Sequence, residues 1–157
     1  MRGRTQPEVT GLTVRRAGTD NLDALALLFD AYRRFYRQPA DLAGGRAFLA
    51  ERIARGESAI FLAELDGQPA GFTQLYPSFT SAGMARIFIL NDLFVAPEAR
   101  GQGVATTLLR RAAEFGREEG AVRLVLSTAT DNFTAQAVYE REGWLRDDAF
   151  LTYRLAL

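Results

Sequence analysis

The chain has 157 residues, 48% hydrophobic and 24% charged, which is typical of one globular domain with a single core. Its formal net charge is zero and no apolar run reaches the length of a membrane span, so we expect neither nucleic acid nor a membrane as partner, and a cytoplasmic location. Cysteine, histidine and lysine are all absent, which excludes a thiol nucleophile, a histidine base and a lysine Schiff base, and we expect no metal.

The predicted elements follow one another without an internal repeat or a linker. Residues 1–8 are predicted to be a flexible tail and residues 9–157 a single domain. The order of elements predicts an α/β (α+β) fold, with a mixed central sheet of about seven strands flanked by about four helices. In chain order we expect a strand at 9–16, helices at 20–37 and 41–55, strands at 59–65, 68–79 and 86–95, a helix at 104–119, a strand at 122–126, a helix at 132–142 and a final hairpin at 144–157.

A glycine-rich turn joins the apolar strand at 86–95 to the helix at 104–119. It reads R-G-Q-G-V-A from Arg100 to Ala105. The first turn of a helix has unpaired N–H groups and a partial positive charge, so this arrangement is suited to binding phosphate. The alternative is that the two glycines only permit a tight turn. A dinucleotide-binding fingerprint fits less well, because its third glycine would fall on Thr106.

Two motifs resemble one family, the GCN5-related N-acetyltransferases. R-G-Q-G-V-A resembles the family's pyrophosphate loop, which is Gln or Arg, two residues, Gly, one residue, then Gly or Ala. N-F-T-A-Q-A-V-Y-E-R-E-G-W, at 132–144, is similar to its last conserved block, and it lies one strand after the loop helix as expected. The resemblance covers the chain from Leu12 onward. It implies acetyl-CoA as co-substrate, direct acetyl transfer to a small-molecule primary amine in a ternary complex, and a possible homodimer.

The resemblance also implies where acetyl-CoA binds. The end of the strand at 86–95, near Leu93–Val95, is expected to splay from the parallel strand at 122–126. Its free backbone groups would then hydrogen-bond the pantetheine arm in the way that a neighbouring strand does. Asn132 is expected to hydrogen-bond the pantetheine or simply to cap its helix. Tyr139 is expected to protonate the departing thiolate, the alternative being an ordinary core tyrosine. The remaining expected acetyl-CoA contacts are Leu93, Phe94, Val95, Arg100, Gly101, Gln102, Gly103, Val104, Ala105 and Thr106.

The sequence signals for the acceptor-binding site are weaker than those for the acetyl-CoA site. Asp92, within a strand of apolar residues, is expected to bind the acceptor amine or help to deprotonate it, the alternative being an outward-facing residue or an arginine partner. L-N-D-L-F-V resembles the diamine (polyamine) acetyltransferase subgroup, but Asn91 replaces the first of its consecutive acids. Tyr32, Tyr36 and Tyr76 are the other expected substrate contacts, and the nearby arginines either attract a substrate carboxylate or form a solvated basic face.

Three other functions stay open from the sequence. One is a catalytically silent acyl-CoA-binding sensor domain, and another is an acetyltransferase acting on a protein amine. An unrelated nucleotide-binding α/β domain is the third. Polyamine-like and amino-acid-like amines remain alternatives for the acceptor.

Overall fold

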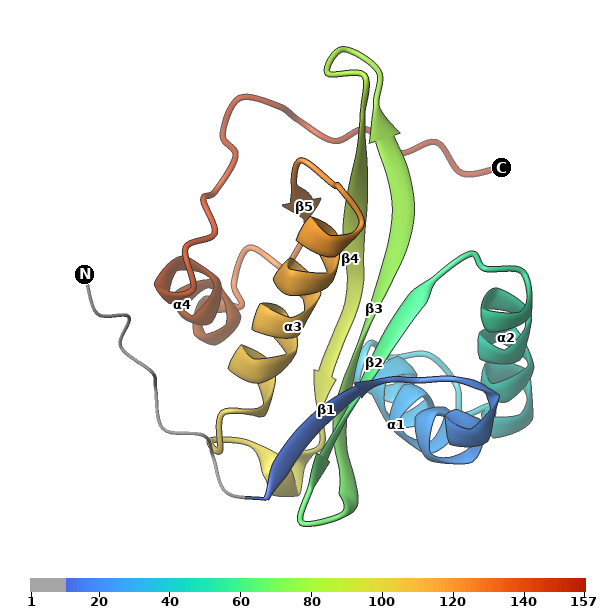
Figure 1. Ribbon diagram of the computed structural model, residues 1–157. Coiled ribbons are helices and arrows are strands. Elements are labelled where there is room, and N and C mark those ends of the chain that lie inside the picture. The colour runs from blue at the N-terminus through green and yellow to red at the C-terminus, as the bar shows by residue number, and fades with distance from the viewer. Residues whose placement is uncertain (1–10) are drawn as a thin grey trace. The chain divides into compact units, whose positions relative to one another are not determined.

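A computed structural model describes residues 11–157 (Figure 1). The predicted tail at 1–8 and the first residues of the predicted opening strand lie outside the described residues. The chain divides into two compact units, Met1–Ser127 and Thr128–Leu157. The first unit holds the sheet, and the second holds one helix and the C-terminal segment. That residues 9–157 form a single domain stays a prediction.

The first unit is built on a mixed sheet with the strand order β1-β2-β3-β4-β5. Neighbouring strands from β1 to β4 pair antiparallel, whereas β4 and β5 pair parallel. The parallel pair is joined through a helix, because parallel neighbours need a crossover connection. The strands are β1 (Leu12–Arg16), β2 (Ala59–Leu65), β3 (Gln68–Thr80), β4 (Ala85–Val95) and β5 (Leu124–Val125).

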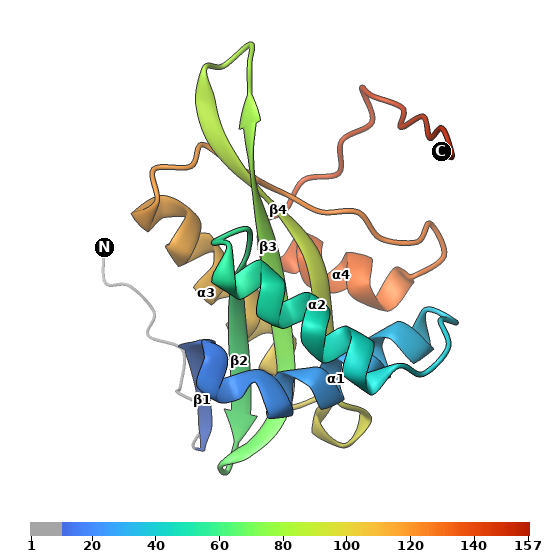
Figure 2. The ribbon, with the colours of Figure 1, turned by 90° about the vertical axis from the view of Figure 1, so that its right-hand side faces the viewer.

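Helices cover both faces of this sheet. Figures 1 and 2 show α1 and α2 together on one face and α3 on the other. The helices of this unit are α1 (Leu22–Phe35), α2 (Leu42–Ala54) and α3 (Val104–Glu118), with two short 3-10 turns, η1 (Thr19–Asn21) and η2 (Pro97–Ala99). These bounds agree closely with those predicted from periodicity and caps, and Asp41 caps α2 by accepting a hydrogen bond from the Gly44 N–H at 2.9 Å.

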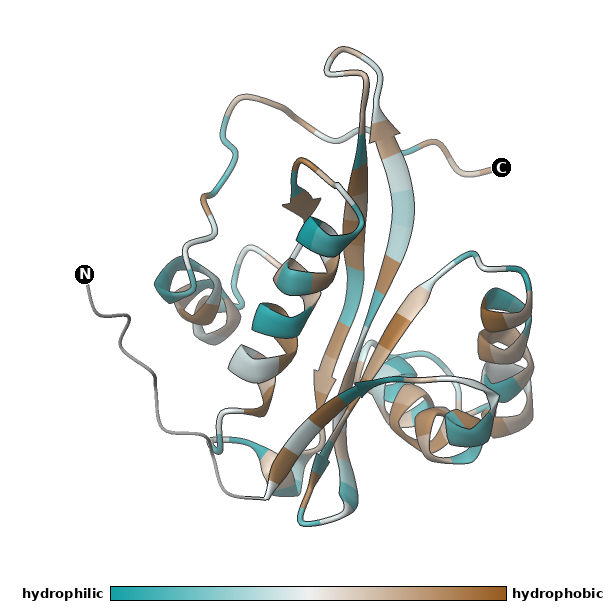
Figure 3. Cartoon of the chain, in the orientation of Figure 1, coloured by the Kyte–Doolittle hydropathy of each residue, from teal (hydrophilic) through white to brown (hydrophobic). Residues whose placement is uncertain are grey.

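Aromatic side chains anchor the helices to the sheet. On the α3 face, the ring of Phe115 lies 5.4 Å from that of Phe61 and 5.0 Å from that of Phe88, between centroids. On the opposite face, Phe29 of α1 meets Phe72 of β3 at 6.1 Å. Figure 3 shows the same division, with hydrophobic residues along the strands and hydrophilic ones on the outer turns of α3.

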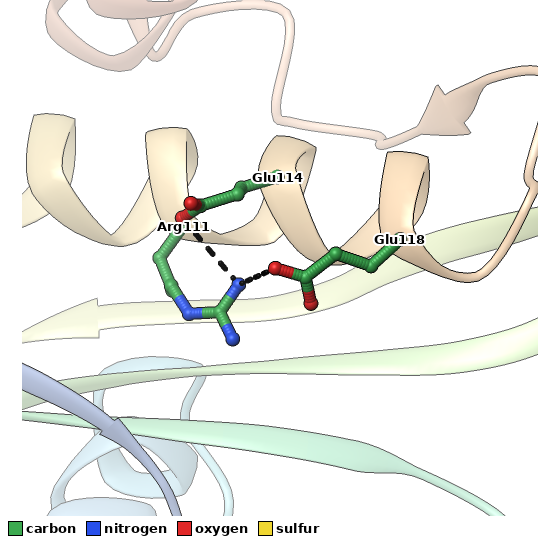
Figure 4. Close-up of polar contacts among 3 residues, drawn as sticks. All are labelled: Arg111, Glu114 and Glu118. Carbon is green, nitrogen blue, oxygen red and sulfur yellow. Dashed lines mark hydrogen bonds and ion pairs between the residues drawn. The ribbon is translucent and has the colours of Figure 1, made fainter.

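The outer surface of α3 is polar. Arg111 reaches from the helix toward the sheet: its guanidinium lies 4.8 Å from the Phe61 ring centroid, and its Nη1 lies 3.5 Å from Glu114 Oε2 and 3.4 Å from Glu118 Oε1 (Figure 4). Exposed pairs of this kind contribute only a few tenths of a kcal/mol. Buried Leu108 and Leu109 therefore pack the helix against the sheet. This packing also fixes the direction in which the N-terminus of α3 points.

An extra residue in β4 changes which face its side chains occupy. Gln74 of β3 pairs with Asp92, and Asn91 is the extra residue in the register. A bulge reverses the alternation of side chains along a strand. Phe88, before the bulge, therefore contacts α3, whereas Asp92 and Phe94, beyond it, face α1.

Two parts of the predicted sheet are absent from the described residues. The sheet has five strands rather than about seven, because the prediction of a C-terminal hairpin at 144–157 is wrong and its two arms are not strands. In the second unit, α4 (Phe133–Arg141) is followed by an irregular segment. Within it the Ala149 N–H donates to the Asp147 carboxylate at 2.9 Å, so local side-chain bonding replaces part of a strand ladder.

Candidate active site

The glycine-rich loop delivers unpaired backbone donors to the start of α3. Gly101 and Gly103 have φ values of 76° and 82°, a left-handed conformation that glycine adopts without strain. The first helical bond runs from the Thr107 N–H to the Gly103 carbonyl at 3.0 Å. The N–H groups of residues 101–105 have no acceptor among residues 11–157. The loop therefore fits a pyrophosphate, because exposed N–H groups at a helix N-terminus attract anions.

The strand that leads into the loop has a partly unpaired edge. β5 is shorter than the predicted 122–126 and pairs with β4 only at Phe88 and Ile89. Beyond this point, Leu93–Val95 has no parallel partner within the described residues, as expected for strands that splay apart. The Val95 carbonyl on this edge already accepts a hydrogen bond, from Arg100 Nε at 3.1 Å. Main-chain groups on this edge fit an extended ligand lying alongside β4.

Asp92 is a buried carboxylate surrounded by neutral donors. Its side chain is 3% exposed. Gln74 Nε2 donates to Oδ2 at 2.6 Å and Asn91 Nδ2 donates to Oδ1 at 3.1 Å, and the Tyr32 phenol lies close enough for the charge of Asp92 to raise its pKa. No ion pair involves Asp92 within residues 11–157. The expectation of an outward-facing residue or an arginine partner therefore does not hold, because the bulge at Asn91 turns the carboxylate inward.

Two tyrosines share the environment of Asp92. Burial and the charge of Asp92 raise the pKa of the Tyr32 phenol far above its ordinary value. Burial and the same charge raise the pKa of Tyr76 to about 12, against an opposing effect of Arg52. Both phenols are therefore neutral at physiological pH and able to donate hydrogen bonds.

Aromatic rings connect this buried carboxylate to the surface. Tyr32 and Tyr36 are 4.9 Å apart between ring centroids, and Tyr36 is 5.3 Å from Phe35. Tyr36 and Phe35 are exposed, whereas Tyr32 is half-buried. The Arg100 guanidinium lies 5.9 Å from the Phe35 centroid, so this aromatic series ends beside the glycine-rich loop. The structure thus brings together three predicted substrate contacts, Tyr32, Tyr36 and Tyr76, with Asp92.

The second unit carries the other motif. Asn132 caps α4, its Oδ1 accepting from the Ala135 N–H at 3.2 Å, so the capping role is confirmed and the pantetheine contact stays a prediction. Tyr139 lies on α4 with its ring 6.2 Å from that of Trp144. The Trp144 N–H donates to the Tyr139 carbonyl at 2.9 Å, which folds the end of the motif back on its helix.

One residue of the acceptor side was missed in the sequence. Gln74 is fully buried on β3, donates the shorter of the two amide hydrogen bonds to Asp92, and keeps Oε1 without a partner. Its signal was an amide within the otherwise apolar run A-G-F-T-Q-L. The pairing with Asp92 depends on the bulge at Asn91, which side-chain alternation alone does not predict.

Two further features bear on the class of protein. No helix in the described part of the chain is both long and apolar enough to cross a bilayer. No group of three or more carboxylate, histidine or cysteine side chains within residues 11–157 is arranged to hold a metal.

Comparison with known proteins agrees with this arrangement. The sequence model of the acetyltransferase (GNAT) family matches residues 25–144. The uncharacterized N-acetyltransferase YhfO of Bacillus subtilis is 46% identical over 92% of this chain and 97% of its own, and a probable acetyltransferase of Haemophilus influenzae is 30% identical over 87% and 92%. The crystal structure of a probable acetyltransferase superposes with a TM-score of 0.88 at 45% identity, covering 92% of this chain and 97% of that one. The chain therefore belongs to the GNAT family and is an acetyl-CoA-dependent acetyltransferase.

Proposed function

We propose that the chain transfers the acetyl group of acetyl-CoA directly onto a primary amine of a small molecule, within a ternary complex. The observation that carries this proposal is the buried carboxylate of Asp92, which accepts hydrogen bonds from two neutral side-chain amides and forms no ion pair within residues 11–157. A buried carboxylate is unfavourable unless it is paired. A protonated amine is the cation that this reaction would supply.

The proposed acetyl-CoA site follows the two features described above. The N–H groups at Gly101–Ala105, together with Arg100 and Thr106, would bind the pyrophosphate. The backbone of Leu93–Val95 and the side chain of Asn132 would bind the pantetheine arm. The acceptor would approach along Tyr32, Tyr36 and Tyr76, with its ammonium group on Asp92.

The proposed chemistry is a single displacement. The amine nitrogen attacks the thioester carbonyl carbon, so a C–N bond forms and the C–S bond breaks. The ammonium group first loses one proton, to Asp92 or to water, because only the neutral amine can attack. The nitrogen loses a second proton as the tetrahedral intermediate collapses, and this proton balances the one that Tyr139 donates to the departing thiolate. A backbone N–H near Val95 is the proposed donor to the oxyanion of the tetrahedral intermediate. The products are an N-acetylated amine and the free thiol of CoA.

Tyr139 is tested by removing only its hydroxyl. Tyr139→Phe should lower kcat by about a hundredfold or more, because general acid catalysis typically contributes about a hundredfold to ten-thousandfold. The affinity for acetyl-CoA, measured by calorimetry, should stay unchanged. Normal turnover in this variant would remove Tyr139 from the mechanism.

The loop is tested with a matched pair of glycines. Gly101→Ala should weaken acetyl-CoA binding at least tenfold, because a side chain at φ 76° strains the loop that would hold the pyrophosphate. Gly120→Ala, at φ 72° beyond the end of α3, imposes similar backbone strain away from the loop. Equal acetyl-CoA affinity in the two variants would contradict the proposed loop.

A further inference from the structure

The acceptor side contains a single unit of negative charge. Asp92 is the only carboxylate whose charge acts on both Tyr32 and Tyr76. The two side-chain amides bonded to it, from Asn91 and Gln74, are neutral. One carboxylate with no cationic partner in the described chain has room for one ammonium group.

The carboxylate of Asp30, on the helix that carries Tyr32, is already used. Asp30, on α1, lies 3.2 Å from Arg34 Nε in an ion pair and accepts a hydrogen bond from the Asp41 N–H at 2.9 Å. It therefore holds α1 and the start of α2 in place. A second ammonium group on an acceptor would find no free carboxylate here.

The outer end of the aromatic series is instead positively charged. Arg33, in the last turn of α1, donates from Nη1 to the Pro39 carbonyl at 2.9 Å. Arg100, beside Phe35, would be paired with the pyrophosphate of acetyl-CoA in the ternary complex. Arg37 follows Tyr36 directly in the chain. Neither Arg33 nor Arg37 forms an ion pair within residues 11–157, so their charges remain uncompensated by neighbouring carboxylates. They would repel a cation and attract an anion at this end.

We propose that the acceptor is a molecule with one ammonium group whose far end is uncharged or anionic, and that polyamines are poor acceptors. The inference rests on the proposed function, because it assigns the ammonium group to Asp92. It follows from the order of charges along the aromatic series. One buried carboxylate lies at the inner end, rings lie between, and arginines lie at the outer end.

The test compares three amines of equal length that differ only at the far end. They are pentylamine, 5-aminopentanoate and pentane-1,5-diamine, with propyl and hexyl series as alternatives where chain length limits turnover. The diamine should show about tenfold lower kcat/KM than the monoamine, equivalent to about 1.4 kcal/mol. The amino acid should equal or exceed the monoamine. Added salt should reduce both differences, because these outer charges are exposed.

Two substitutions of Asn91, the bulge residue, provide a second test of the proposal. Asn91→Asp adds a carboxylate beside Asp92 at an exposed position, and it should raise the ratio of diamine to monoamine kcat/KM by about tenfold. Asn91→Ala removes the same amide without adding charge, and it should leave that ratio unchanged.

The outcomes separate the two proposals. A wild-type protein that prefers the diamine overturns this inference while the amine acetyltransferase reaction stands. A protein that binds acetyl-CoA but releases no thiol with any amine of these series, or with amino acids and polyamines, overturns the proposed function and this inference together.

Discussion

Asp92→Asn separates the role of charge from that of shape. The substitution keeps the size of the side chain and removes its negative charge at a site that is 3% exposed. The amide nitrogen would then face Gln74 Nε2, which now donates to Oδ2 at 2.6 Å. Rotation of the Gln74 amide turns its unpartnered Oε1 toward that nitrogen, which restores the hydrogen bond and leaves Nε2 in the position without a partner that Oε1 occupied.

The expected effect on stability is therefore small. Replacing a buried charge that lacks a counter-ion is often neutral or stabilising. We expect the free energy of unfolding to change by less than about 1 kcal/mol, the worth of a typical hydrogen bond. Urea unfolding followed by circular dichroism measures this change, and it verifies that the variant is folded.

The expected effect on the reaction is large. Losing one partner of a buried charged pair costs roughly 2–5 kcal/mol, and a middle value of about 3 kcal/mol lowers kcat/KM for the amine roughly a hundredfold. Thiol release measures kcat/KM, and calorimetry should find unchanged affinity for acetyl-CoA. An amine kcat/KM equal to that of the wild type would refute the assignment of Asp92, and equal losses for amine and acetyl-CoA would indicate a general disturbance.

Two further predictions concern packing and titration. Gly71→Ala should destabilise the fold by about 1–3 kcal/mol, because its Cβ would lie 2.6 Å from the Phe94 carbonyl oxygen, whereas Gly18→Ala, with no atom within 4 Å, should be nearly neutral in urea unfolding. The raised pKa values of Tyr32 and Tyr76 mean that these phenols keep their protons above pH 10, where the unfolded chain loses them. The free energy of unfolding should therefore be insensitive to these groups below pH 10 and fall as pH rises above it. Tyrosinate absorbance should show both groups ionising late, and ordinary titration of every tyrosine in the folded protein would contradict their burial.

Local signals predicted the elements that local forces determine. Gly101 and Gly103 precede a helix-period pattern, and the structure gives both the left-handed backbone that glycine permits. Asp66 and Gly67 form the predicted hairpin turn, with φ values of 51° and 79°. Each of these features depends on the conformation of a few consecutive residues, so the sequence is sufficient to predict it.

Features that depend on pairing between distant strands were not predicted. The inward position of Asp92 follows from the bulge at Asn91, and its strongest partner, Gln74, is on another strand. The predicted hairpin at 144–157 failed for a related reason. Alternating apolar residues show that a segment suits a strand, but they do not show that a partner strand pairs with it.

The central claim is that this chain acetylates an amine, with acetyl-CoA as the acetyl donor. The most direct measurement follows free thiol and N-acetylated product together, across diamines, polyamines, amino acids, aminoglycosides and short peptides. Because the chain contains no cysteine, a thiol reagent reports only the CoA that is released. We predict one N-acetylated molecule per thiol with at least one class of small amine. Tight acetyl-CoA binding without amine-dependent thiol release would contradict the claim and favour an acyl-CoA sensor, and release with peptides alone would instead identify a protein amine as the acceptor.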